Sequence, residues 1–201
     1  MLLRIHPQNP QDRLIQQVVD VLKRGGIIVY PTDTIYGLGC DIYQVKAVQE
    51  ICRIKHIDPK KAQLSFVCSD LSHLSDFARQ ISNTTYRKLK ECLPGPYTFI
   101  LPASKQVPKI LQSKKDTIGL RVPDNKIALT LVRELGHPIL STSLPGEFVE
   151  DYTDPELIYE KYKNIVDIVI DGGIGGSVPS TIVNCVDDSF EVIREGAGEW
   201  I

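Results

Sequence analysis

Hydrophobic residues in this chain alternate between helical spacing and short apolar runs. Aliphatic side chains within residues 14–22 recur at the spacing of one helix face, and the Gly-Gly pair at 25–26 ends that helix. The Asn-Pro pair at 9–10 predicts its start, with asparagine as the N-cap and proline as the first helical residue. The β-branched run 27–30 that follows predicts a buried strand.

The same alternation continues toward the C-terminus. Further strands are predicted at 64–68, 97–101, 117–122, 138–142, 165–170, 180–186 and 190–194. Further helices are predicted at 43–56, within 71–92 as one or two short helices, from 124 or 125 to 136, and at 154–163. Alternating strands and helices are typical of the α/β class. We find no linker, repeat or low-complexity tract, so we expect one domain, residues 1–201, built on a mixed sheet.

Composition places the chain among ordinary globular proteins. Its 201 residues are 42% hydrophobic and 24% charged, and no apolar run approaches the roughly 20 residues that span a bilayer. The N-terminus carries no signal-peptide pattern, and the five cysteines include no C-x-x-C pair, which indicates a reducing compartment. We therefore expect a cytoplasmic protein with no membrane partner. The four histidines are scattered without zinc-ligand spacing, so no metal site is predicted on the protein.

Charge is unevenly distributed although the net charge is only −2. Residues 46–133 hold 16 basic and 7 acidic side chains, whereas residues 134–201 hold 3 basic and 14 acidic ones. A basic middle segment in a nearly neutral protein is typical of a protein that binds an anionic ligand. The alternative is that these charges cover solvated helix faces.

The segment 30–41, YPTDTIYGLGCD, is the first candidate for chemistry. The strand 27–30 runs into what we predict to be a loop of two threonines, an aspartate and two glycines. Ligands of α/β sheets bind at the carboxyl ends of strands, and hydroxyls with bare backbone amides suit an anionic ligand. The alternative is a tight turn in which Asp33 and the threonines form local caps.

Three other polar positions lie in or beside predicted strands. Arg121 lies within the apolar strand 117–122, where an arginine is costly to bury unless it is paired. Because arginine grips carboxylates and phosphates with two bonds, we interpret Arg121 as functional. Thr98 begins a strand after a rigid Pro-Gly-Pro turn, and the hydroxyls of 141–143 end another strand.

Lysines and glycines give weaker signals. Lys55 lies at a predicted helix end, where a cation is favourable in any case. Lys61 lies in a loop just before a strand and is a candidate phosphate contact. The glycine-rich segment 172–176 is not followed by a helical pattern, so we do not interpret it as a phosphate loop. The sequence lacks the motifs of P-loop nucleoside triphosphatases, serine hydrolases and zinc proteases.

Taken together, seven segments resemble the YrdC-like family, whose members include threonylcarbamoyl-AMP synthases. In chain order they read YPTDTIYGLGCD, RIK, PGPYTFIL, TIGLRVP, LSTS, PSTIVN and IREGAG. One such motif would be weak, but the ordered set is highly specific. The details IGLRVPDN and STSLPGEF look closest to the YciO branch of the family.

The resemblance implies both a fold and a reaction. The implied fold is an open twisted mixed sheet with helices around a large concave, basic cavity. The implied reaction joins L-threonine, bicarbonate and ATP into threonylcarbamoyl-AMP and pyrophosphate, with ATP as a substrate and Mg²⁺ bound through it. The product feeds N6-threonylcarbamoyladenosine formation in tRNA. Double-stranded RNA, tRNA and the other proteins of that modification are the partners that the resemblance implies.

The resemblance also assigns roles to residues, motif by motif. Arg121 is implied to form an ion pair with the threonine carboxylate. Lys55 and Arg121 are the implied catalytic residues. The other implied substrate contacts are Thr32, Thr34 and Thr181. The implied nucleotide contacts are Lys55, Lys61, Thr98, Ser141, Ser143 and Arg194.

Two departures from the family pattern keep a second function open. The typical synthase has K-x-R where this chain has Lys55-His56-Ile57, and it has an asparagine where this chain continues Ser143-Leu144-Pro145. Loss of a phosphate-gripping cation costs about 1.5–3 kcal/mol of charge-assisted hydrogen bonding. The alternatives are therefore a protein of this fold that binds RNA or a nucleotide with little synthase activity, and a related enzyme acting on another carbamoyl or acyl adenylate.

Overall fold

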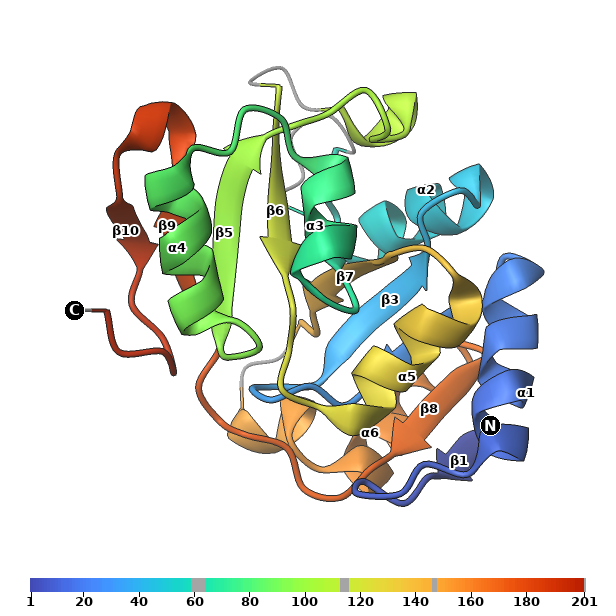
Figure 1. Ribbon diagram of the computed structural model, residues 1–201. Helices are drawn as coiled ribbons and strands as arrows, with labels where there is room; N and C mark the ends of the chain where they lie inside the picture. The colour runs from blue at the N-terminus through green and yellow to red at the C-terminus, as the bar shows by residue number, and fades with distance from the viewer. Residues whose placement is uncertain (59–63, 113–115, 146–147, 201) are drawn as a thin grey trace.

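The computed structural model describes residues 1–58, 64–112, 116–145 and 148–200. A ten-stranded open sheet crosses the molecule in the order β1-β8-β2-β3-β7-β4-β6-β5-β9-β10 (Figure 1). The strands are β1 (Leu2–Arg4), β2 (Ile27–Tyr30), β3 (Gly37–Asp41), β4 (Ser65–Val67), β5 (Tyr97–Pro102), β6 (Thr117–Arg121), β7 (Ile139–Ser143), β8 (Ile168–Asp171), β9 (Thr181–Asn184) and β10 (Glu191–Arg194).

Six α-helices and three 3₁₀ turns complete the described part of the chain. They are α1 (Asp12–Lys23), α2 (Val45–Ile54), α3 (Leu71–Phe77), α4 (Asn83–Cys92), η1 (Lys109–Leu111), α5 (Lys126–Leu135), η2 (Val149–Tyr152), α6 (Pro155–Tyr162) and η3 (Val186–Asp188). Strand β2 runs parallel to β8 but antiparallel to β3, so the predicted α/β class with a mixed sheet is confirmed. Among the described residues, no helix is both long and apolar enough to cross a membrane.

Two apolar clusters hold the sheet and helices together. In one, α1 and α5 lie side by side and bury Val18, Leu22 and Leu131 against β2 and β8 (Figure 1). The larger cluster joins the other helices to the sheet and includes Phe66 and Phe99, both fully buried. Burial of a phenylalanine or leucine side chain contributes about 1.5–3 kcal/mol, so these clusters account for the rigidity of the strands between them.

Helix ends follow the predicted chemistry at α5 but not at the start of α1. Asn125 Oδ1 accepts the N–H of Ala128, and Gly136 closes α5 in the left-handed conformation. Helix α1, by contrast, begins at Asp12, so the predicted cap at 9–10 is wrong. The preceding backbone turns around His6, whose Nδ1 accepts N–H bonds from residues 8 and 9, and so this segment stays outside the helix.

Two strands were missed by the sequence pattern. Residues 37–41, predicted as part of a loop, form β3 at the centre of the sheet, between β2 and β7. The N-terminal strand β1 pairs in parallel with β8, with Leu2 opposite Val169. Strands are predicted from runs of β-branched residues. The glycines in β3 interrupt such a run, and β1 is too short to contain one.

The half-buried imidazole of His73 makes stability depend on pH. Its Nδ1 lies 3.0 Å from Ser69 Oγ and accepts the Ser69 N–H, and burial lowers the pKa of His73 below its ordinary value of 6.5. Asp70 and Asp76 act against this shift, and His137 reinforces it. The unfolded chain therefore takes up this proton more readily, so stability is highest above pH 6.5 and falls as the pH drops through the lower folded pKa.

We expect His73→Gln to flatten that dependence. The wild type should lose up to about 1.4 kcal/mol per pH unit more than the variant over this window, the limit for one proton. Urea unfolding at pH 7.5 and 5.5 measures the difference. Equal slopes for the two proteins would show that His73 does not titrate differently in the folded state.

Candidate functional site

A cavity of about 670 Å³ is lined by residues of β6 and of strands on both sides of β6. Hydroxyl groups dominate its polar lining, and its described charged residues are Arg121 and Arg194. The serines and threonines of the lining are Thr32, Thr34, Ser65, Thr98, Thr117, Ser141, Thr142, Ser143 and Ser180. A concave site with hydroxyl donors and two cations is suited to an anionic, polar ligand.

Strand register explains why these residues share one wall. Alternate side chains of a strand point to opposite faces, so Thr98 and Ile100 of β5 face the cavity while Phe99 is fully buried behind them. The same alternation places Ile182 and Asn184 of β9 on the cavity side. The cavity side of the wall therefore mixes polar and aliphatic side chains, and the side behind it is apolar at Phe99.

Arg121 lies at the base of the cavity and is only 7% exposed. Its Nη2 donates to Asp33 Oδ1 at 2.6 Å and to Thr34 Oγ1 at 3.3 Å. Asp33 is held in turn by the N–H of Asp124, which donates to its other carboxylate oxygen at 3.1 Å. Arg121 Nε is the one buried side-chain polar atom without a partner in the described residues. A buried donor left free in this way is costly unless a ligand satisfies it.

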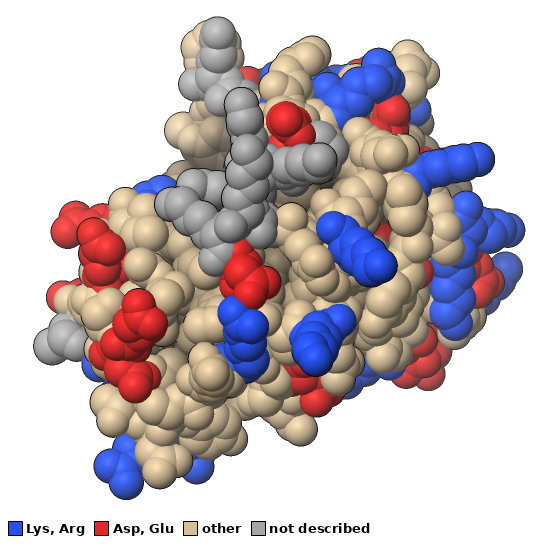
Figure 2. Space-filling model, turned by 90° about the horizontal axis from the view of Figure 1, so that it is seen from above, with Lys and Arg blue, Asp and Glu red and all other residues tan. Residues whose placement is uncertain are grey.

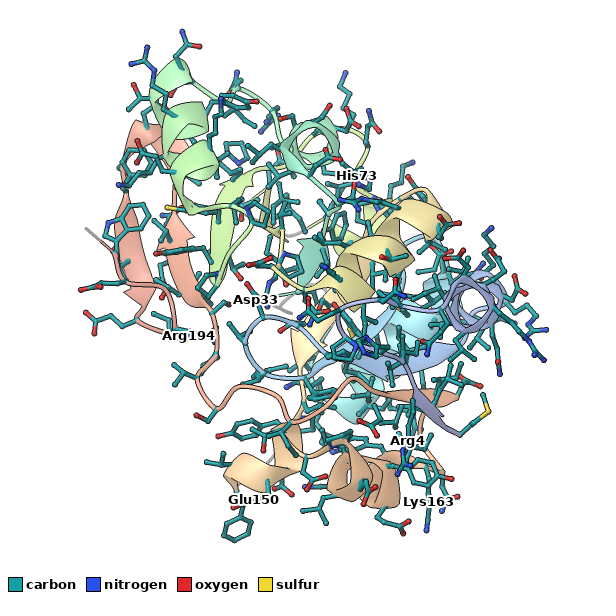
Figure 3. All side chains as sticks on the ribbon, turned by 60° about the horizontal axis from the view of Figure 1, so that its bottom comes forward. Arg4, Asp33, His73, Glu150, Lys163 and Arg194 are labelled. Atoms are coloured by element: carbon teal, nitrogen blue, oxygen red, sulfur yellow. The ribbon has the colours of Figure 1, made fainter. Side chains whose placement is uncertain are left out.

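The loop 31–36 supports this arginine. Thr32 Oγ1 donates to Ile35 O at 2.7 Å and accepts the N–H of Thr34 at 3.1 Å. Thr32 therefore builds the local turn that the sequence left open as one alternative, and this turn places the Thr34 hydroxyl beside Arg121 and in the cavity. Figure 3 shows Asp33, from the same loop, near the centre of the molecule.

The predicted nucleotide contacts occupy the adjoining wall. Thr98 Oγ1 lies 2.9 Å from Ser180 Oγ, and Ser141 accepts a hydrogen bond from Tyr30 at 2.7 Å. Lys55, at the end of α2, donates to Ser143 O at 2.7 Å, and burial lowers its pKa. The predicted contact Lys61 lies outside the described residues.

The predicted nucleotide contact Arg194 is part of the cavity lining, whereas the predicted substrate contact Thr181 is not. Arg194 lines the cavity and donates to the carbonyl of Ser180 through Nε and Nη2, at 3.1 and 2.7 Å. Burial, and secondarily the charge of Arg121, lower the pKa of Arg194. Thr181 is 1% exposed and lies behind the wall, since its hydroxyl donates to Gly198 O and accepts the Gly196 N–H. Figure 3 shows Arg194 beside β9 and β10.

Sequence reasoning missed three residues that shape the site. Asp33 pairs with Arg121 across 88 positions, Tyr30 bonds Ser141 across 111, and Ser180 links Thr98 to Arg194. A buried arginine in a strand does signal that some carboxylate must lie nearby. Nothing in the local sequence says which one.

Apolar side chains pack into the core at both departures from the family pattern. Ile57 is partly buried against the larger apolar cluster, and Leu144 belongs to it at 4% exposure. Both positions therefore contribute to the core in this chain. Within the described residues, no three or more His, Cys, Asp or Glu side chains are grouped so as to hold a metal ion.

An open mixed sheet with this cavity defines an α/β protein whose candidate site suits a polar, anionic ligand. The chain belongs to the Sua5/YciO/YrdC family: the family model, described as telomere recombination, matches residues 20–196. The uncharacterized protein YciO of Escherichia coli K12 is 47% identical over 97% of this chain and 95% of its own. The crystal structure of E. coli YciO superposes with a TM-score of 0.91, at 43% identity, over 99% of this chain and 97% of that one.

More distant members have a named activity. A threonylcarbamoyl-AMP synthase of Chromobacterium violaceum is 32% identical over 94% of this chain and 96% of its own. The crystal structure of P. abyssi Sua5 complexed with L-threonine superposes with a TM-score of 0.88 at 26% identity. It covers 98% of this chain, which spans 57% of that protein. The family thus includes threonylcarbamoyl-AMP synthases as well as uncharacterized YciO proteins.

Proposed function

We propose that this protein makes threonylcarbamoyl-AMP from L-threonine, bicarbonate and ATP. The observation that carries the proposal is Arg121, buried at the base of the cavity with a free Nε and the Thr34 hydroxyl beside it. A carboxylate bound there would satisfy the free donor by charge-assisted hydrogen bonding. The named synthases in the family and the threonine complex of P. abyssi Sua5 support this reading.

The chemistry requires positioning and charge stabilisation more than a protein nucleophile. The threonine amine attacks carbon dioxide derived from bicarbonate and loses a proton, which gives a carbamate. A carbamate oxygen then attacks the α-phosphate of ATP, the bond from that phosphorus to the bridging oxygen breaks, and pyrophosphate leaves. Holding the two reactants in line can supply about 7–11 kcal/mol of the barrier.

The chain offers a residue for each task. Arg121 and Thr34 hold the amino acid, while Thr98 and Ser141 line the nucleotide side. Lys55, which donates to the carbonyl of the lining residue Ser143, supplies positive charge near the developing pyrophosphate. Magnesium enters as the counter-ion of the ATP phosphates, and no protein ligands are assigned to it. The proposal places the protein in the cytoplasm, upstream of transfer of the threonylcarbamoyl group to tRNA by partner proteins.

Pyrophosphate release tests the proposal. Purified protein with ATP and Mg²⁺ should release pyrophosphate only when both L-threonine and bicarbonate are present. Omission of either, and replacement of L-threonine by D-threonine, are the matched controls. Release that ignores threonine, or no release at any protein concentration, would contradict the proposed function.

A second candidate is a binding protein for RNA or nucleotides with this fold. The observation that favours it is the packing of Ile57 against the larger apolar cluster, at the position where the family pattern has a phosphate-side arginine. On the face shown in Figure 2, Lys and Arg side chains lie mainly over the centre and the right, and Asp and Glu gather at the left. Binding of double-stranded RNA that weakens steeply with salt would support this candidate, and salt-independent binding would not.

A further inference from the structure

Tyr30 reaches across one strand of the sheet to touch another. It ends β2, and its hydroxyl contacts Ser141 on β7, although β3 lies between these two strands. The side chain is fully buried. A ring that crosses a strand at this depth needs positions without side chains beneath it.

Gly37 and Gly39 provide that space. A Cβ atom at Gly37 would lie 3.2 Å from Tyr30 Cε1 and 3.1 Å from Ser141 Oγ. At Gly39 it would lie 2.9 Å from the same ring atom and 2.8 Å from the Ile139 side chain. The alternate glycines of YGLGC therefore form a slot for the tyrosine ring, which gives the motif a structural reason independent of any ligand.

The direction of the hydrogen bond has a chemical consequence. Tyr30 Oη donates to Ser141 Oγ at 2.7 Å. A phenol is a stronger acid than an alcohol, so it is the better donor of the pair. Burial raises the pKa of Tyr30 to about 12, which keeps it protonated at neutral pH.

Ser141 is thereby left with its own proton to donate. A hydroxyl has one donor, and when its oxygen accepts from a neighbour that donor must point elsewhere. The residues that the structure describes offer no acceptor for it, and Ser141 faces the cavity at 4% exposure. The free direction is the cavity.

We infer that Tyr30 is a positioning residue that holds the Ser141 hydroxyl as a hydrogen-bond donor to an anionic oxygen of the bound ligand. Resting on the proposed function, that oxygen belongs to a phosphoryl group of ATP. Tyr30 itself does not line the cavity, so it acts through Ser141. The amino-acid end of the site, at Arg121, is held by separate contacts from Asp33 and Thr34.

A double-mutant cycle tests this coupling. The affinity for Mg-ATP is measured by calorimetric titration for the wild type, Tyr30→Phe, Ser141→Ala and the double variant. Tyr30→Phe alone should weaken ATP binding about three- to tenfold, the effect of one hydrogen bond, and should leave the affinity for L-threonine unchanged. In the Ser141→Ala background the same change should have no further effect. Tyr162→Phe, which removes a buried hydroxyl bonded to Pro145 O, is the control and should leave ATP affinity intact.

Each outcome decides the matter. Equal losses from Tyr30→Phe in both backgrounds would mean that the tyrosine hydroxyl acts independently of Ser141, and the inference fails. Unchanged ATP affinity in Tyr30→Phe would also overturn it, with the proposed function left standing. A wild type that binds no ATP would overturn both.

Discussion

The paired substitution Arg121→Gln with Asp33→Asn is expected to abolish threonine binding while the protein stays folded. The two side chains are 9% and 8% exposed and form an ion pair at 2.6 Å. Removing only one of them leaves an unpaired buried charge, which typically costs 3–5 kcal/mol, whereas removing both leaves a neutral hydrogen-bonded pair of similar size. Loss of the guanidinium should lower threonine affinity about 100-fold or more, or roughly 3 kcal/mol.

Calorimetric titration with L-threonine measures the loss, and thermal unfolding verifies the fold. The matched control is Arg79→Gln with Asp116→Asn, an ion pair of the same residue types whose side chains are 52% and 55% exposed. That control should bind threonine like the wild type. Retained threonine affinity in the Arg121 and Asp33 pair variant would show that the amino acid binds elsewhere.

Asp33→Asn alone should lower stability but strengthen the response to threonine. Without ligand, the buried guanidinium of Arg121 loses its counter-charge, at a cost of about 3 kcal/mol. With ligand, the threonine carboxylate replaces that counter-charge, whereas in the wild type two carboxylates must share one guanidinium. Each tenfold gain in affinity adds about 1.4 kcal/mol of ligand stabilisation.

Unfolding of both proteins with and without L-threonine measures this difference. We expect a larger threonine-induced rise of the melting temperature in Asp33→Asn than in the wild type. The opposite order would mean that Asp33 helps to bind the amino acid directly. Glycine and L-lactate separate the contributions of the carboxylate from those of the amine and side chain.

The α/β class and most strands follow from local patterns, because a buried β-branched run such as 27–30 has few alternatives. Strand β3 does not follow from them, because two of its five residues are glycines whose value lies in the space they leave for Tyr30. The predicted start of α1 at 9–10 is wrong because a contact outside the motif decides the backbone there. The Asn-Pro pair satisfies a capping rule, but His6 holds this segment in a different turn.

The candidate site could be predicted in its residue types more than in its contacts. Arg121 was recognisable because arginine inside an apolar strand requires a partner or ligand. Its partner Asp33 comes from a loop 88 positions away, and only the folded sheet brings the two together. The position of Thr181 depends on strand register, since a shift of one residue exchanges the cavity side for the core side. Local sequence does not determine that register.

The order of strands in the sheet has a consequence for biosynthesis. Strand β1 pairs with β8 at the edge of the described sheet, and β2 pairs with both β3 and β8, so the N-terminal layer needs residues 168–171 before it can close. On a ribosome, the first 30 residues therefore emerge long before their pairing partner does. Such non-local pairing slows folding and leaves strand edges exposed meanwhile. Nascent chains of this protein should accordingly depend on holding chaperones until most of the polypeptide has been synthesised.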